Sequence, residues 1–174
     1  MKPLKQVAQA YMALSDGQTK LQEDAFGDAE AAFRTAMEVT RTIPEEEVFD
    51  HDGFDALCHA GLSNALGGLG RYDESLASAD MALRYFNRRG DLHQDEGVQW
   101  ITAVISRARA LARTGNPAEA LNVFQTAQEM IDERKGNLPQ KEALQKMVAD
   151  NIAILRSSIP EDGSKRKAWW EFWS

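Results

Sequence analysis

Hydrophobic and polar residues alternate with a helical period along most of the chain. The pattern is clearest over residues 54–83, where two amphipathic stretches are separated by the turn Gly70-Arg71-Tyr72-Asp73. Apolar residues three and four positions apart form one face of an α-helix, and no stretch alternates with period two over the length of a strand. We therefore predict an all-α fold in which residues 54–83 form one complete helix–turn–helix unit.

A first helical hairpin is predicted before this unit. Its first helix should cover residues 3–22, and the apolar pattern restarts at Ala29 and continues to about Arg41. Gly17 lies inside the first helix, where glycine costs about 1 kcal/mol relative to alanine. We therefore expect Gly17 to let another helix approach closely.

Capping and turn residues delimit the remaining helices. We expect the third helix to have its N-cap within residues 50–53 and to end near residues 67–70, and the fourth to have Asp73 as N-cap and to end at residues 87–90. The fifth helix should end at Thr114 and Gly115, and the sixth should have Asn116 as N-cap and Pro117 as its first residue. The last helix should cover residues 140–157.

The second helices of the three hairpins share one spacing of small and aromatic residues. The three sets are Ala29-Phe33-Ala36, Ser75-Ala79-Ala82 and Ala120-Phe124-Ala127, and a turn of one kind precedes each set. Small residues at such positions let the two helices of a hairpin approach, and the aromatic residue fills the gap to the next unit. The pattern resembles the tetratricopeptide repeat (TPR), most closely in GLGRYDESLASADMAL and GNPAEALNVFQTAQ.

This resemblance implies an α-α superhelix of three TPR-like hairpins and a C-terminal capping helix, about seven helices in all. The usual repeat has about 34 residues, so the longer spacing here predicts longer helices and connections. We expect residues 1–158 to form the TPR-like helical repeat domain and residues 159–174 to form a linker and tail. The layout also resembles small uncharacterised bacterial TPR proteins, which implies no activity.

Members of the family generally bind a peptide or a partner helix in the concave groove formed by the first helices. The groove-facing residues that the register implies are Tyr11, Leu14, Gln18, Leu57, Asn64, Thr102, Ile105 and Arg109. Their polar groups can hydrogen-bond a peptide, and their apolar members can form pockets. The TPR subset that binds chaperone C-termini has Lys, Asn and Arg at positions held here by Leu14, Gly61, Thr102 and Ser106, so we do not expect that binding mode.

Arg107 stands where the family commonly has leucine. A guanidinium that points into the hairpin needs a carboxylate, because an unpaired buried charge costs several kcal/mol. The candidate partners are Asp80, Asp95, Glu96 and Glu129. The alternative is that the guanidinium extends to water.

The composition of the chain mainly excludes classes of function. A chain of 174 residues with 43% hydrophobic residues suits one domain, and its net charge of −7 argues against nucleic acid as a partner. Cys58 is the only cysteine, which fits a reducing compartment. Residues 1–14 lack the apolar run of a secretory signal, and no apolar stretch is long enough to span a membrane. We therefore expect a cytoplasmic protein.

A metal site is one interpretation of His51, Asp55 and His59, which follow one another at intervals of four residues. We favour capping or hydrogen bonds between hairpins for these residues, because Gly53 suggests that the helix begins only after His51. The sequence has no phosphate-binding loop, nucleophile elbow or CxxC pair. We therefore predict a non-enzymatic scaffold for protein–protein interaction, without a cofactor.

The last ten residues combine basic and aromatic side chains. Residues 163–174 carry a net charge of +2, which leaves −9 for the rest of the chain, and the rings belong to Trp169, Trp170, Phe172 and Trp173. The first interpretation is a docking peptide that fills a groove in a partner or in a second copy, forming a homodimer. The second is a tail that covers its own domain or an addition after the Gly-Ser pair. The third is a peripheral membrane or targeting signal, the only membrane contact we expect.

Overall fold

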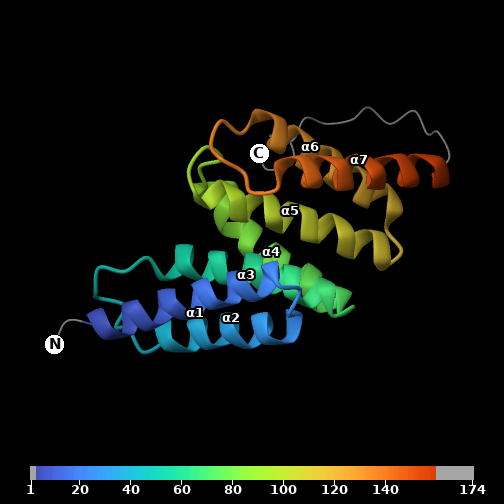
Figure 1. The fold of residues 1–174 in the computed structure, drawn as a ribbon. Helices are drawn as coiled ribbons and strands as arrows, with labels where there is room; N and C mark the ends of the chain where they lie inside the picture. Colours follow the sequence, from blue (N-terminus) through green and yellow to red (C-terminus); the bar gives the residue numbers. More distant parts are fainter. Residues whose placement is uncertain (1–2, 160–174) are drawn as a thin grey trace.

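The computed structural model describes residues 3–159, and these residues form seven α-helices and no strand (Figure 1). The helices are α1 (Leu4–Gln22), α2 (Phe26–Thr40), α3 (His51–Gly68), α4 (Tyr72–Arg89), α5 (Glu96–Arg113), α6 (Pro117–Glu133) and α7 (Lys141–Ser158). The predicted all-α fold of three hairpins and a final helix is confirmed. The predicted tail lies outside the described residues, apart from Ile159.

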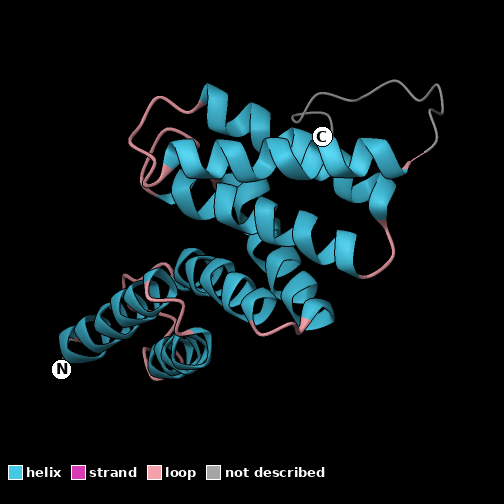
Figure 2. Ribbon diagram, turned by 45° about the vertical axis from the view of Figure 1, so that its right-hand side comes forward, coloured by secondary structure: helices cyan, strands magenta, loops and turns pink. Residues whose placement is uncertain are grey.

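Consecutive helices pair as hairpins, and each hairpin packs through both of its helices on the first helix of the next hairpin. α3 contacts both α1 and α5, while α2 packs on α3 and α4 packs on α5. α1 and α2 therefore lie at one end of the molecule and α5, α6 and α7 at the other, as Figures 1 and 2 show. α3 belongs to both hydrophobic clusters of the core, the N-terminal cluster around Phe33 and the C-terminal cluster around Phe86 and Phe124.

Close approach of the helices in the first two hairpins depends on two glycines. A Cβ atom at Gly17 would lie 2.7 Å from Phe33 Cε1, and one at Gly61 would lie 2.6 Å from the same atom. The Phe33 ring, which is fully buried, therefore fills a space between α1 and α3 that exists only because both residues lack a side chain. The prediction for Gly17 is confirmed, whereas the matching role of Gly61 was not predicted.

The helix starts differ from the expected ones in three places. α2 begins at Phe26, three residues before the expected restart at Ala29. α3 begins at His51 itself, because the Asp50 side chain accepts a hydrogen bond from the Gly53 amide at 3.0 Å and caps the helix there. The expected N-cap of α4, Asp73, is wrong. α4 starts directly after Arg71, and Asp73 lies in its first turn, where a carboxylate complements the helix dipole.

The sixth helix starts as expected, with Asn116 at the N-cap position and Pro117 as its first residue. The Asn116 side chain does not cap the helix, and its amide nitrogen lies 3.4 Å from the carbonyl oxygen of Thr114 instead.

α7 covers the apolar face of α6. Val148, Ile152 and Leu155 are buried in the C-terminal cluster, while Ile154 on the outer side of α7 remains 65% exposed. A final helix of this kind shields the last hairpin from water. Within the described residues, no helix is long and apolar enough to cross a membrane.

Candidate functional site

A cavity of about 770 Å³ lies where the first helices of the hairpins meet two connections, the one between α4 and α5 and the one between α6 and α7. We call this cavity the inner groove. Its apolar lining comes from Tyr11 of α1, Leu57 of α3, Val98 of α5 and Pro139 before α7. Side chains that are distant in the sequence thus converge on one concave surface.

Two of these apolar side chains are held in place by the core. The Tyr11 ring is 51% exposed, but its contact with the Phe54 ring is edge-to-face, with 5.1 Å between the ring centroids. Leu57 is half-buried and packs against both hydrophobic clusters. The groove therefore presents preformed apolar contacts.

The polar lining of the inner groove is rich in amides and poor in cations. Carboxamide groups are supplied by Gln18, Gln94, Gln99 and Asn137. Each carboxamide offers both donors and an acceptor, which is the combination that pairs with a peptide backbone. Asp95 and Glu96 add two carboxylates. Glu96 Oε1 accepts a hydrogen bond from the Asp91 amide at 2.8 Å, and neither carboxylate forms an ion pair within residues 3–159.

Arg134 joins the two connections that form the rim of the groove. Its Nη1 donates to the carbonyl oxygens of Leu92 and Gln94 at 2.6 and 2.5 Å, and its Nε and Nη2 donate to that of Asn137 at 3.1 and 2.7 Å. The side chain is buried, and Gly97 leaves room for it, since a Cβ atom there would lie 2.6 Å from Nη1. This role of Arg134 was not predicted from the sequence, because two of its partners are 40 and 42 residues away.

The eight residues predicted to face the groove fall into three groups. Tyr11, Gln18 and Leu57 line the inner groove. Leu14 and Ile105 are each only 6% exposed and belong to the two core clusters, so they support the walls. Asn64, Thr102 and Arg109 do not line this cavity, although none of them is fully buried.

Arg107 pairs with carboxylates on both helices that flank α5. Its Nε lies 2.9 Å from Asp80 Oδ1 of α4, and its Nη2 lies 2.8 Å from Glu119 Oε1 of α6. Asp80 was among the candidate partners, whereas Glu119 was missed. The guanidinium therefore links three helices.

Two of the candidate metal ligands, His51 and Asp55, line a second cavity of about 620 Å³ between the end of α2, the following connection and the start of α3, whereas His59 does not. The two ring nitrogens of His51 lie 3.1 and 3.0 Å from the carbonyl oxygens of Phe49 and Ile43, so this ring ties α3 to the connection between hairpins. Among the described residues, no group of three His, Cys, Asp or Glu side chains is arranged to hold a metal ion.

Burial shifts the pKa values of the other two candidate metal ligands, Asp55 and His59. Desolvation raises the pKa of Asp55, an effect that the charge of His59 opposes. Desolvation lowers the pKa of His59, and its Nδ1 is buried without a hydrogen-bond partner in the described part of the chain. These shifts follow from packing on α3 and need no ligand.

Comparison with known proteins supports the repeat architecture. Residues 2–144 match the family described as Domain of Unknown Function (DUF3856). The structure is similar to the crystal structure of a TPR-like protein from Chlorobium tepidum TLS, with a TM-score of 0.86 and 56% sequence identity over 90% of this chain and 99% of that chain. A comparison with curated proteins found no match. The resemblance to TPR proteins inferred from the sequence is confirmed.

Proposed function

Because the chain belongs to the family of the Domain of Unknown Function DUF3856 and has the fold of a TPR-like protein, we propose that it is a non-enzymatic scaffold that binds an extended segment of a partner protein in the inner groove. The helical repeat itself is shared with the structural relative. The ligand class is our inference from the groove.

One observation supports the proposal above the others, namely the combination of side chains in the inner groove. The lining combines apolar surface from Tyr11, Leu57 and Val98 with carboxamides that can hydrogen-bond a peptide backbone. A mostly preformed cavity with a few convergent polar groups is the usual form of a binding site. The clamp formed by Arg134 holds the rim in place, which lowers the entropy that binding would cost.

The proposal can be tested with peptides selected from a random displayed library on the full-length protein. We expect Tyr11→Ala and Gln99→Ala to weaken binding of the selected peptides about tenfold or more, as for a central interface residue. Met12→Ala is the matched control, because this residue is 71% exposed on the same helix but does not line the groove. Binding should then stay within about twofold of the wild type.

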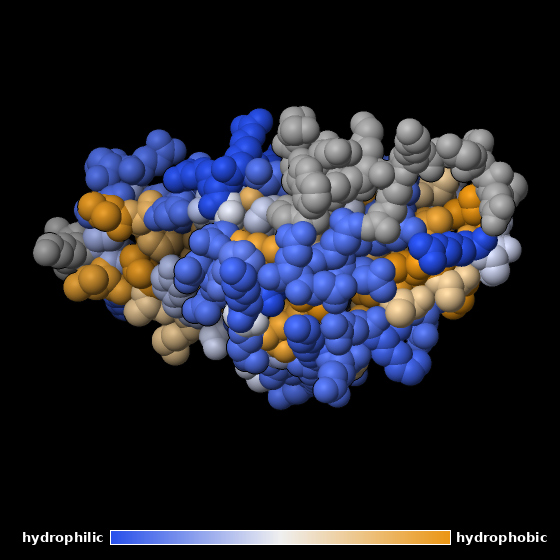
Figure 3. Space-filling view, turned by 90° about the horizontal axis from the view of Figure 1, so that it is seen from above, coloured by the Kyte–Doolittle hydropathy of each residue, from blue (hydrophilic) through white to orange (hydrophobic). Residues whose placement is uncertain are grey.

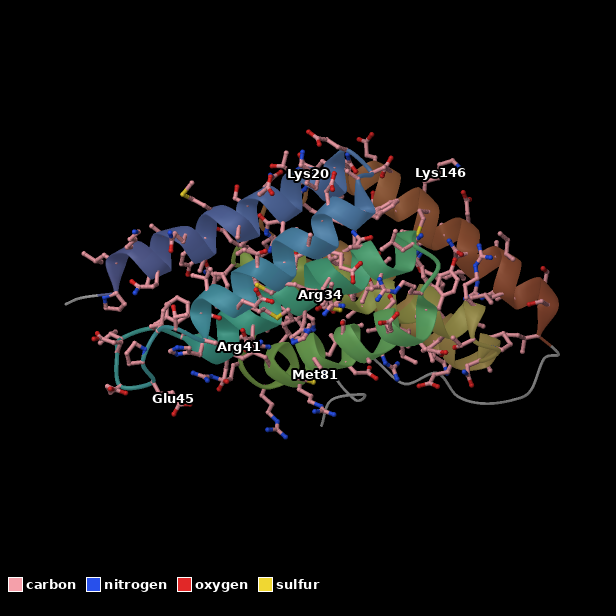
Figure 4. All side chains as sticks on the ribbon, turned by 90° about the horizontal axis from the view of Figure 1, so that it is seen from below. Lys20, Arg34, Arg41, Glu45, Met81 and Lys146 are labelled. Carbon is pink, nitrogen blue, oxygen red and sulfur yellow. The ribbon has the colours of Figure 1, made fainter. Side chains whose placement is uncertain are left out.

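A second control lies on α4, away from the residues that line the groove. Met81 is 46% exposed and does not line the cavity, and Figure 4 shows it in the view from below together with Arg34 of α2. The groove would not be the binding site if Met81→Ala weakened peptide binding as much as Tyr11→Ala does, or if no substitution in the groove changed peptide binding. Asn64→Ala and Arg109→Ala test whether the bound segment extends along α3 and α5 beyond the cavity.

A further inference from the structure

The charges of the inner groove favour a cationic ligand. The guanidinium of Arg134 faces backbone carbonyl oxygens, whereas the carboxylates of Asp95 and Glu96 have no cationic partner in the described residues. A basic segment that brought rings to Tyr11 and Leu57 would give the two carboxylates a counter-charge and would cover the apolar lining.

The chain itself contains such a segment. Residues 165–174 read Lys-Arg-Lys-Ala-Trp-Trp-Glu-Phe-Trp-Ser, in which three consecutive cations precede four aromatic rings. Three of the four tryptophans of the protein are in this segment, and the fourth, Trp100, is buried in the C-terminal cluster. Tryptophan is the residue most enriched among binding anchors.

The position of α7 allows this segment to reach the groove. Pro139, on the rim, lies two residues before α7 begins, and Figure 1 shows α7 running from that side of the molecule to the other. An α-helix of 18 residues is about 27 Å long. The nine residues from 160 to 168, which precede the first ring of the segment, can span up to about 32 Å when extended. They are long enough to return along the length of α7 and bring the rings that follow to the cavity.

We propose that residues 165–174 dock in the inner groove of their own chain, with aromatic rings on the surface of Tyr11, Leu57 and Val98 and the three cations near Asp95 and Glu96. This inference rests on the proposed function, because it makes the tail an intramolecular ligand of the same groove. A tethered segment acts at an effective concentration in the millimolar range. A partner segment must therefore displace the tail in order to bind.

A paramagnetic label at the C-terminus tests this arrangement in the full-length protein. Ser174→Cys supplies one reactive thiol, because Cys58 is fully buried and burial raises the pKa of its thiol to about 12. With a nitroxide on the new thiol, we expect strong broadening of the amide signals of Tyr11, Leu57 and Gln99. The amides of Thr35 and Met81, on α2 and α4, should keep their intensity.

A mixed sample distinguishes docking of the tail in the groove of its own chain from docking in the groove of a second copy. Isotope-labelled protein without nitroxide is combined with unlabelled protein that carries it, and broadening of the groove amides in this mixture would overturn the proposal in favour of exchange between copies. Broadening elsewhere, or none at all, would also overturn it. If there is none, a blue shift of tryptophan emission on adding phosphatidylglycerol vesicles would assign the tail to a membrane surface.

Two further variants and one control test the charge and aromatic contacts, and they keep the two proposals apart. Asp95→Asn with Glu96→Gln should reduce the broadening, whereas Asp150→Asn on α7, whose carboxylate pairs with Lys146, should not. Replacing Trp169, Trp170, Phe172 and Trp173 by serine should strengthen binding of the selected peptides about tenfold. If no peptide binds even this variant, the proposed function fails, and the label experiment still decides whether the tail occupies the groove.

Discussion

At the scale of single residues, packing explains the shifted pKa values of three ionisable groups on α3. Asp55, Cys58 and His59 lie within two turns, and for all three the largest effect on the pKa is loss of hydration, which disfavours the charged form. The pKa of Asp55 and Cys58 is raised and that of His59 is lowered. The same packing that defines the hairpin therefore makes its stability depend on pH.

His59→Gln should flatten this pH dependence on the mildly acidic side of neutrality. Because the pKa of His59 is lower in the folded chain than its ordinary value of 6.5, the unfolded chain binds the proton more tightly. The contribution of neutral His59 is complete above that value and is lost as pH falls through the folded pKa. Urea unfolding from about pH 7 to about pH 5 should show a smaller loss of stability for His59→Gln than for the wild type.

His93→Gln is the control for this experiment, because it removes an imidazole from an exposed loop. Asp55 and Arg34 also act on His59, the carboxylate raising its pKa and the guanidinium lowering it. An unchanged pH profile for His59→Gln would show that another group causes the loss of stability.

Arg134 and Arg107 should contribute different amounts to the free energy of unfolding, because their partners are buried to different extents. Arg134→Met should cost about 3 kcal/mol of unfolding free energy, because the buried guanidinium satisfies three backbone carbonyl oxygens that would lose their donors. Arg107→Met should cost about 1 kcal/mol or less, since Asp80 and Glu119 are half-exposed and regain water.

Urea unfolding at low and high salt measures this difference. The effect of Arg107→Met should shrink with added salt, whereas that of Arg134→Met should persist, because partly exposed ion pairs are screened and buried hydrogen bonds to carbonyls are not. Equal losses for the two variants would contradict the assignment of Arg134 as the clamp of the groove rim.

At the scale of helices, the contact of Phe33 with two glycines fixes the spacing of α1, α2 and α3. Gly61→Ala should destabilise the protein by about 2 kcal/mol, because the added methyl group overlaps the Phe33 ring. Gly67→Ala in the same helix should be neutral or stabilising by about 0.5 kcal/mol, since the nearest atom is Ser75 Oγ at 3.4 Å and alanine favours the helix. Thermal unfolding of both variants tests this pair.

A second substitution identifies the atoms responsible. Phe33→Leu shortens the side chain opposite Gly61, so combining it with Gly61→Ala should cost less than the sum of the two single changes. Strict additivity would mean that the methyl group acts elsewhere in α3.

The helices could be predicted from the sequence because their signals are local. The period of the apolar residues, Pro117 and the turn glycines mark helices whose boundaries the structure reproduces within a few residues. Gly17 was predicted from its cost within a helix. The partner of that glycine, the Phe33 ring, and the equivalent role of Gly61 depend on how α1, α2 and α3 pack, which a local pattern does not specify.

The candidate site could be predicted only in part. The repeat register identified the inner faces of the first helices, and Tyr11, Gln18 and Leu57 line the cavity. It did not predict that Leu14 and Ile105 are buried, because the register does not fix how deeply helices of this length embed. The polar rim comes from connections between helices, whose position depends on contacts such as those of Arg134 with Leu92 and Gln94.

At the scale of the whole molecule, the two ends of the repeat are connected mainly through α3. This helix supplies residues to both core clusters, and α1 and α2 contact the rest of the described chain mainly through it. Exposed hydrophobic residues occur at both ends of this axis, as Figure 3 shows. Leu4 and Met12 of α1 are each 71% exposed, and Ile154 of α7 is 65% exposed.

This arrangement predicts that the α1–α2 hairpin opens independently of the C-terminal end. In a linear repeat, stability is a sum of unit and neighbour terms, so a terminal hairpin with one neighbour has the fewest contacts to lose. Phe33→Leu should lower the free energy of hydrogen exchange by about 1 to 2 kcal/mol for amides of α1 and α2. Amides of α5 and α6 should keep their protection, because Phe33 belongs only to the N-terminal cluster.

Phe124→Leu is the matched change, since Phe124 occupies the same position in the second helix of the third hairpin. It should lower protection in α5, α6 and α7, because it weakens the C-terminal cluster that these helices share. Native-state exchange in low concentrations of denaturant measures both variants. Equal loss of protection in all seven helices for Phe33→Leu would show that the repeat unfolds as a single unit, and α3 would then transmit stability between the ends as well as connect them.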